Sequence, residues 1–214
     1  MRVHVSTRVA LRRAVTAIAA MTVAFAMLGS TALAAPPVER DHIASSGAGA
    51  ANNACVGTIC SATSVFAVVN TPDGPSQACL DISRYEQVGT NFIQLGFETG
   101  CAPLAPSSLT IDTKGLTTAA LSPTQIAVQV FTCDSTGCNP TATRTALVSA
   151  TYTGVGTVAT FRSNSKSIFG GCAMYFVGKG SSREAAATLT IDGRTLDALG
   201  SIFASTQKTK VLCH

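Results

Sequence analysis

The stretch QIAVQVF, residues 125–131, alternates apolar side chains with polar or small ones. Ile126, Val128 and Val130 occupy every second position, so they point to one side of an extended chain. A period of two is typical of a β-strand with one face in a core and the other in water. This stretch therefore predicts a half-buried strand.

A second stretch, NFIQLGFE at 91–98, alternates in the same way, and we expect Ile93, Leu95 and Phe97 on its buried face. Further segments of strand composition are found at 63–70, 79–87, 108–112, 145–153, 158–163, 172–178 and 187–192. The turn signals TPDGP, NSK, GKGSS and DGR separate them at short spacing.

Helical spacing of apolar residues occurs in TLDALGSIF, 195–203, which predicts one short helix. So few helices could not cover the faces of a parallel sheet. We therefore expect an all-β fold, an antiparallel β-sandwich of the immunoglobulin-like or jelly-roll-like kind.

The N-terminus has the three parts of a secretory signal peptide: a basic start, an apolar run at 14–28 and the small-residue exit STALA. The run is shorter than the roughly 18 residues expected of a membrane-spanning helix. We expect residues 1–34 to be removed after Ala34, which leaves no membrane span in the mature chain. The pair Arg12-Arg13 leaves export by the twin-arginine route open beside export by the general secretory route.

Four of the 15 Lys and Arg residues lie in this leader, and all 11 acidic residues follow it, so the mature chain is formally neutral. A neutral domain has no general electrostatic attraction to nucleic acid, so we expect no nucleic-acid partner. The segment 35–54, rich in Ala, Gly and Ser, predicts a flexible tail, and 55–214 predicts one β-sandwich domain.

All eight cysteines lie in the mature part, and an even set in an exported chain is typical of disulfides. Eight cysteines allow 105 pairings. Our preferred hypothesis joins neighbours along the chain: Cys55 with Cys60, Cys79 with Cys101, Cys133 with Cys138, and Cys172 with Cys213.

Cys133 and Cys138 also raise two other possibilities. A zinc site would need a second ligand pair, and a thioredoxin-type site needs C-x-x-C at the start of a helix, whereas here four residues separate the two cysteines. The mature chain has only His42 and His214, one in the predicted tail and one at the end. We therefore expect a disulfide that fixes the turn, and no histidine-dependent catalysis.

Other sites for chemistry are few. Glu86 and Glu98 flank the turn QVGTN and could act together in glycan hydrolysis, although exposed charges at strand ends are the more common reading. Aromatic platforms for sugar are scarce, because the chain has no Trp and three Tyr. We expect no cofactor.

Two polar clusters could bind ions. Oxygens of Asp134, Ser135 and Asn139 could hold a surface Ca²⁺, but one carboxylate is too few and we predict no metal site. A moderately basic region could meet an anionic partner or consist of scattered solvated charges; it contains Arg162, Lys166 and Arg183.

The segments 128–166 and 178–196 resemble a loose group of uncharacterised secreted bacterial proteins. The shared features are the CDSTGC turn at 133–138, the TYTGVG strand end at 151–156, the SREAAA segment at 182–187 and the Asp192-Gly193 turn. The resemblance implies an exported β-sandwich and no particular activity.

These observations predict a secreted, non-enzymatic interaction or surface-associated module with an unknown protein or glycan ligand. A secreted carboxylate-dependent hydrolase directed at glycans and a secreted protease inhibitor stay open as alternatives. The sequence does not specify an oligomeric state.

Overall fold

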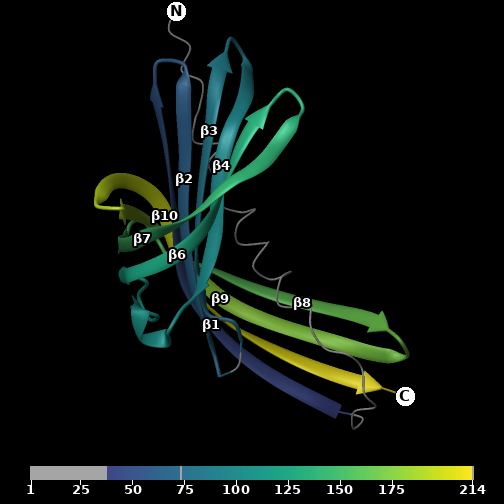
Figure 1. Cartoon of the computed structure of the whole chain (residues 1–214). Helices are drawn as coiled ribbons and strands as arrows, with labels where there is room; N and C mark the ends of the chain where they lie inside the picture. The colour runs from purple at the N-terminus through teal and green to yellow at the C-terminus, as the bar shows by residue number, and fades with distance from the viewer. Residues whose placement is uncertain (1–37, 73, 214) are drawn as a thin grey trace, which may run out of the picture. The chain divides into compact units, whose positions relative to one another are not determined.

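The computed structural model describes residues 38–72 and 74–213, and nearly all of them lie in β-strands (Figure 1). The elements are β1 Val38–Val56, β2 Ile59–Thr71, β3 Gln77–Val88, β4 Asn91–Pro103, the 3-10 turn η2 Pro106–Ser108, β5 Leu109–Ile111, β6 Thr118–Asp134, β7 Gly137–Gly154, β8 Ala159–Phe169, β9 Cys172–Ile191 and β10 Arg194–Cys213. The predicted leader, 1–34, and His214 lie outside the described residues. No helix in the described part of the chain has the length and hydropathy needed to cross a membrane.

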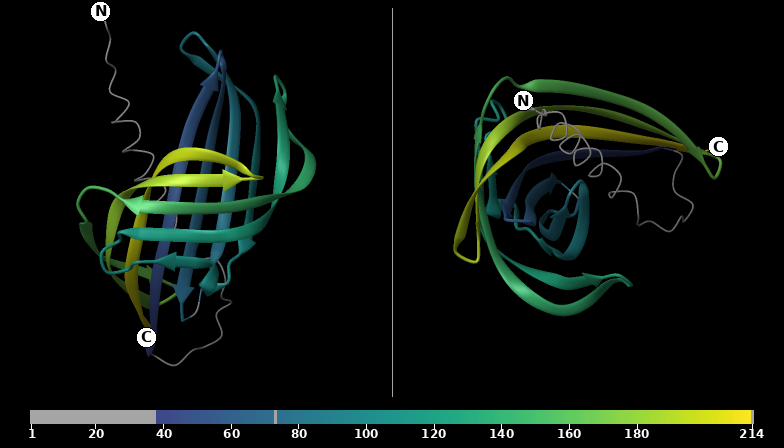
Figure 2. Two further views of the ribbon diagram at one scale, coloured as in Figure 1. Left: turned by 90° about the vertical axis from the view of Figure 1, so that its left-hand side faces the viewer. Right: turned by 90° about the horizontal axis from the view of Figure 1, so that it is seen from above.

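All strand pairs are antiparallel, and the sheet closes on itself. The order is β10-β1-β2-β3-β4-β6-β7-β9, and β9 pairs with β10 to complete the circuit. Along β9, residues 172–182 pair with β8 and residues 185–191 pair with β7. The expected all-β, antiparallel, disulfide-stapled class is confirmed. The two facing layers that we expected are opposite walls of one continuous sheet (Figure 2).

The core lies inside this closed sheet and follows the period of two. In β6, Ile126 and Val128 are fully buried, while Gln125 and Gln129 are exposed. Small residues share the interior with branched ones. The buried cluster includes Ala48, Val65, Ala67, Leu80, Leu116, Ile126, Val128, Ala146, Val148, Tyr152, Leu189 and Ile202.

The predicted buried face of 91–98 is wrong, although the strand is present. Gly96 and Glu98 are the buried residues, and Ile93 is 51% exposed. The ladder between β3 and β4 shifts its register near Arg84, so the alternation does not run unbroken through the stretch. Phe97 is half-buried and stacks on the ring of Phe131, with centroids 4.3 Å apart.

The predicted flexible tail at 35–54 is wrong for its described part, because residues 38–54 belong to β1. This strand pairs with β10 along one edge and with β2 along the other. Ala48 and Ala50 are buried in the core, and the rings of Phe66 and Phe203 stack across the strand with centroids 6.0 Å apart. A Cβ on Gly47 would lie 2.6 Å from Cε1 of the Phe203 ring, so small residues are required here. The described domain therefore begins at Val38.

The predicted helix at 195–203 is also wrong, because this segment is the first half of β10. Ala198 and Ile202 face the core, while Leu199 is 59% exposed. Leu196, Leu199 and Phe203 have helical spacing, whereas Leu196, Ala198 and Ile202 fit a two-residue spacing. Pairing with both β9 and β1 selects the strand.

Two predicted turns, NSK and GKGSS, are wrong as well, since they lie within β8 and β9. A Cβ on Gly180 would lie 2.5 Å from the ring of Phe161, so this glycine allows an aromatic side chain of β8 to cover β9. The predicted DGR turn is confirmed: Asp192 and Gly193 join β9 to β10 with φ of 51° and 78°.

Candidate functional site

Three disulfides join the pairs of our preferred hypothesis, which is confirmed for them: Cys55–Cys60, Cys79–Cys101 and Cys133–Cys138. Each joins directly opposite residues of a hairpin, with Cα atoms 4.0 Å apart. Cys172 is also disulfide-bonded, and Cys213 is its register partner in the ladder between β9 and β10. The pairing of these last two stays a prediction. Disulfides in these numbers indicate an oxidising environment.

The two carboxylates considered for hydrolysis are not brought together. Glu86 is opposite Ile93, whereas Glu98 is opposite Ile82. Four residues along β3 separate these positions, or about 13 Å. Glycosidase carboxylates lie roughly 5 to 9.5 Å apart, so this pair does not have that geometry.

Glu98 belongs to an ion-pair network at one end of the core. Its Oε1 accepts a hydrogen bond from Arg84 Nη2 at 3.0 Å, and its Oε2 accepts from Arg144 Nε at 2.8 Å. Arg144 also pairs with Asp192 in the β9–β10 turn, at 2.6 Å. The Leu147 amide and then the Arg144 guanidinium hold the pKa of Asp192 below its usual value. Both oxygens of Glu98 are thus occupied, which suits a structural clamp joining β3, β4 and β7.

The loop residues considered for Ca²⁺ form a tight turn. Asp134 Oδ1 accepts hydrogen bonds from the amide and the hydroxyl of Thr136, at 2.7 and 2.6 Å. The hydroxyl and then the amide lower the pKa of this carboxyl. In residues 38–72 and 74–213, no three His, Cys, Asp or Glu side chains are grouped as metal ligands.

Beyond the closed part of the sheet, strands continue as projecting ends. We call one of these the hairpin arm: residues 52–61 of the β1–β2 hairpin paired with residues 83–95 of the β3–β4 hairpin. We call another the terminal arm: residues 38–46, 159–169, 172–182 and 204–213, from β1, β8, β9 and β10. Both are visible in Figure 1 as strand ends that extend away from the centre of the sheet.

One side of the hairpin arm gathers exposed apolar side chains around Glu86, which pairs with both Ile59 and Ile93. Val56, Ile59, Val88 and Ile93 share one side of the paired strands, and between 43% and 86% of each residue is exposed. On the other side, Tyr85 and Phe92 contact edge to face with centroids 5.3 Å apart. They line a shallow hollow of about 250 Å³ together with Gln94.

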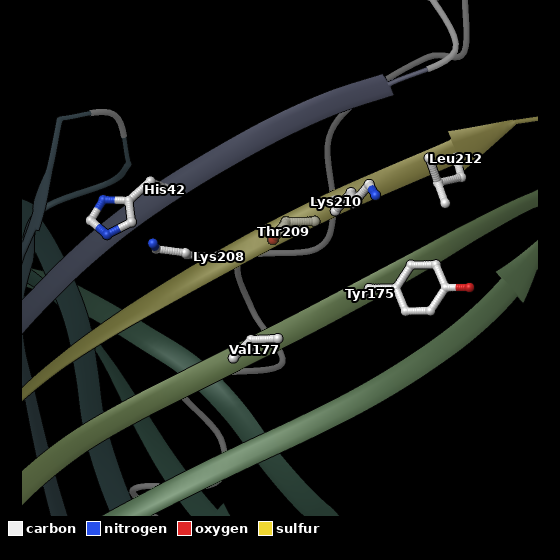
Figure 3. Close-up of a pocket in the computed structure, with 7 residues that line it drawn as sticks. All are labelled: His42, Tyr175, Val177, Lys208, Thr209, Lys210 and Leu212. Atoms are coloured by element: carbon white, nitrogen blue, oxygen red, sulfur yellow. The ribbon is translucent and has the colours of Figure 1, made fainter.

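The terminal arm carries a larger cleft, of about 790 Å³ (Figure 3). Its lining comes from three strands: His42 of β1, Tyr175 and Val177 of β9, and Lys208, Thr209, Lys210 and Leu212 of β10. His42, which we placed in a tail, is an exposed residue of this cleft.

The basic region expected from the sequence is divided by the fold. Arg162 and Lys166 lie on β8 in the terminal arm, whereas Arg183 donates a hydrogen bond to the Gly115 carbonyl at 3.2 Å. Sequence reasoning missed Lys208 and Lys210. Their signal is spacing by two residues in a strand, which the helix prediction for the preceding segment obscured.

Comparisons of this chain with protein-family models, with curated proteins and with solved structures find no match. The resemblance to secreted bacterial proteins therefore stays a prediction.

Proposed function

We propose that this protein is an exported, non-enzymatic interaction module that binds its partners with projecting, disulfide-stapled strand ends. The leader at 1–34, with cleavage after Ala34, is part of this proposal. Cleavage there would leave the whole of β1, which starts at Val38, in the mature chain.

The distribution of exposed apolar side chains carries this proposal. Of the 13 large exposed apolar residues in the described part of the chain, five lie on the hairpin arm and four on the terminal arm. Exposed apolar groups gathered on one region typically mark binding surfaces, whereas single ones need no explanation. The arms, more than the walls of the closed sheet, are therefore the expected contact surfaces.

The disulfide Cys55–Cys60 supports the same role for the hairpin arm. It joins β1 and β2 one residue before the two-residue turn, which begins at Gly57. A binding surface that is rigid before contact loses less conformational entropy on association. We therefore expect the hairpin arm to bind a partner protein with little rearrangement.

The first experiment tests the absence of catalysis. Purified, oxidised mature protein is incubated with panels of glycans and peptides, and products are followed by mass spectrometry. We expect no turnover. Turnover that is abolished by Glu86→Gln or Glu98→Gln would replace this proposal with the hydrolase hypothesis. Inhibition of a secreted protease that is lost in Asp134→Ala would favour the inhibitor hypothesis.

The second experiment tests the surface. Immobilised protein is used to capture partners from the producer's culture fluid, and each captured partner is then purified and titrated. We expect Ile59→Ser with Ile93→Ser to weaken binding at least tenfold, and Leu199→Ser, an equally exposed apolar residue outside the arms, to leave it unchanged. Equal effects of the two variants would contradict a role for the hairpin arm.

A further inference from the structure

Charged residues are sorted between the two faces of the four strands that build the terminal arm. In the closed sheet, the core-facing positions are even-numbered in β1 and β10 and odd-numbered in β9, as the buried Ala48, Ala198 and Ala187 show. Residues that pair directly across two strands point to the same face. Lys166 of β8 pairs with Tyr175 of β9, so the even-numbered positions of β8 continue the core-facing side. The inner face of the arm continues these core-facing positions.

Among the described side chains of β1, β8, β9 and β10, every Lys and Arg occupies an inner-face position, and every Asp and Glu occupies an outer-face position. The basic ones are Arg162, Lys166, Lys179, Arg183, Arg194, Lys208 and Lys210. The acidic ones are Glu184 and Asp197. The mature chain is formally neutral, but in these strands the described cations and anions lie on opposite faces.

Five of these cations have described, exposed side chains on the inner face of the arm: Arg162, Lys166, Lys179, Lys208 and Lys210. None of them lies within 4.0 Å of a carboxylate oxygen among the described side chains. Like charges that face the same side repel one another and destabilise the folded arm. A ligand that brings negative charge would remove this repulsion.

The geometry favours an extended anion over a small one. Lys208 and Lys210 are two residues apart along β10, about 7 Å, and Lys166 lies two strands away across Tyr175, about 10 Å from Lys210. Arg162 and Lys179 are paired on β8 and β9, about 5 Å apart. Tyr175 and Val177 lie among these cations and give the cleft an apolar floor, and the Lys166 ammonium lies 5.4 Å from the centre of the Tyr175 ring. Cations around an apolar floor suit a chain of sugar rings, whose C–H faces pack on apolar side chains while acidic groups meet the cations.

We propose that the inner face of the terminal arm binds a linear acidic polysaccharide, a polymer with carboxylate or sulfate groups on its repeating units. This rests on the proposed function, an exported interaction module, and names the ligand class of one arm. Single-stranded nucleic acid is disfavoured because successive bases need several aromatic platforms and the cleft has one, Tyr175. An anionic membrane is disfavoured because the exposed aromatic residues Phe161 and Phe169 lie on the opposite face from the cations.

The test compares two double variants of equal charge change. Lys208→Gln with Lys210→Gln removes two cations from the cleft, and Lys114→Gln with Arg194→Gln removes two exposed cations elsewhere. Surface changes of this kind leave stability nearly unchanged, which circular dichroism verifies. The probes are dextran sulfate, polygalacturonate, neutral dextran, a single-stranded oligonucleotide and vesicles with anionic lipid, titrated by calorimetry at 50 and 200 mM salt.

We expect the two acidic glycans to bind, with an affinity that falls at least tenfold between the two salt concentrations, and neutral dextran not to bind. The cleft variant should lose about tenfold in affinity and the control variant little, because each exposed charge contact contributes modestly. Failure of both acidic glycans to bind at 50 mM salt, equal losses in both variants, or tighter binding of the oligonucleotide or the vesicles would overturn the proposal. If the glycans fail while partner capture by the hairpin arm succeeds, the ligand class is wrong and the interaction module stands.

Discussion

Removal of single disulfides should destabilise the protein in an order set by loop length. The bridge Cys79–Cys101 closes a loop with a sequence separation of 22, whereas Cys133–Cys138 closes one with a separation of 5. The chain-entropy relation gives about 3.4 kcal/mol for the longer loop and about 2.1 kcal/mol for the shorter one. Replacing both cysteines of a pair by alanine should therefore cost about 1.3 kcal/mol more for the longer loop.

The assay is urea unfolding followed by far-ultraviolet circular dichroism, since the chain has no Trp. Pairwise replacement also avoids leaving a free thiol. We expect the C79A/C101A midpoint to lie below that of C133A/C138A, with C55A/C60A close to the latter because it has the same separation. Thermal midpoints should fall by about 2 to 4 °C per kcal/mol in a domain of this size. A C133A/C138A variant that is less stable than C79A/C101A would refute the loop-length reasoning.

Three further predictions follow from single positions. Glu98→Gln should lower the free energy of unfolding by about 1 to 2 kcal/mol in urea titrations, because two partly exposed arginines lose their anion. The control Glu86→Gln should change it by less than about 0.5 kcal/mol, and equal effects of the two variants would contradict the structural clamp. Gly47→Val should destabilise the fold or prevent export, since the added Cβ would also lie 2.6 Å from the Ala67 carbonyl oxygen. Yield and thermal midpoint measure this effect, and an unchanged thermal midpoint would show that β1 is not packed in this way. The Thr117 hydroxyl and nearby amides lower the pKa of Asp112 to about 2, so the stabilisation by this carboxylate is present above pH 4 and is lost as the pH falls towards 2. Asp112→Asn should reduce the acid dependence of stability, and a pH profile identical to that of the unaltered protein would contradict this role.

The local hairpins could be predicted from the sequence because their signals are short-range. The turn at Asp192-Gly193 and the disulfide Cys133–Cys138 both join residues that are close along the chain, and turn chemistry or cysteine spacing identifies them. The period of two in 125–131 likewise marks the core side of β6 correctly.

The closed sheet could not be predicted, because it depends on pairings between distant segments. A stretch of Ala, Gly and Ser has no apolar pattern of its own, and β1 is ordered by neighbours that supply backbone hydrogen bonds and the rings of Phe66 and Phe203. For the same reason, residues 195–203 form a strand in spite of their helical spacing.

The candidate sites show the same limit. Glu98 looks like an exposed strand-end charge in the sequence, and only the fold brings Arg84 and Arg144 to its two oxygens. The cations of the terminal arm come from separate strands at alternating positions, so no basic run marks them, and Lys208 and Lys210 become part of a surface only through the register of β9 with β10.

The central claim is that export to an oxidising environment fixes this closed sheet through bridged cysteines. Free-thiol titration of the native protein from culture fluid, followed by non-reducing peptide mapping, tests it most directly. We predict no titratable thiol, an N-terminus at Ala35, and linked peptides for Cys55–Cys60, Cys79–Cys101 and Cys133–Cys138. Reduced cysteines in most of the exported molecules, or a peptide that links Cys133 to a different cysteine, would contradict it.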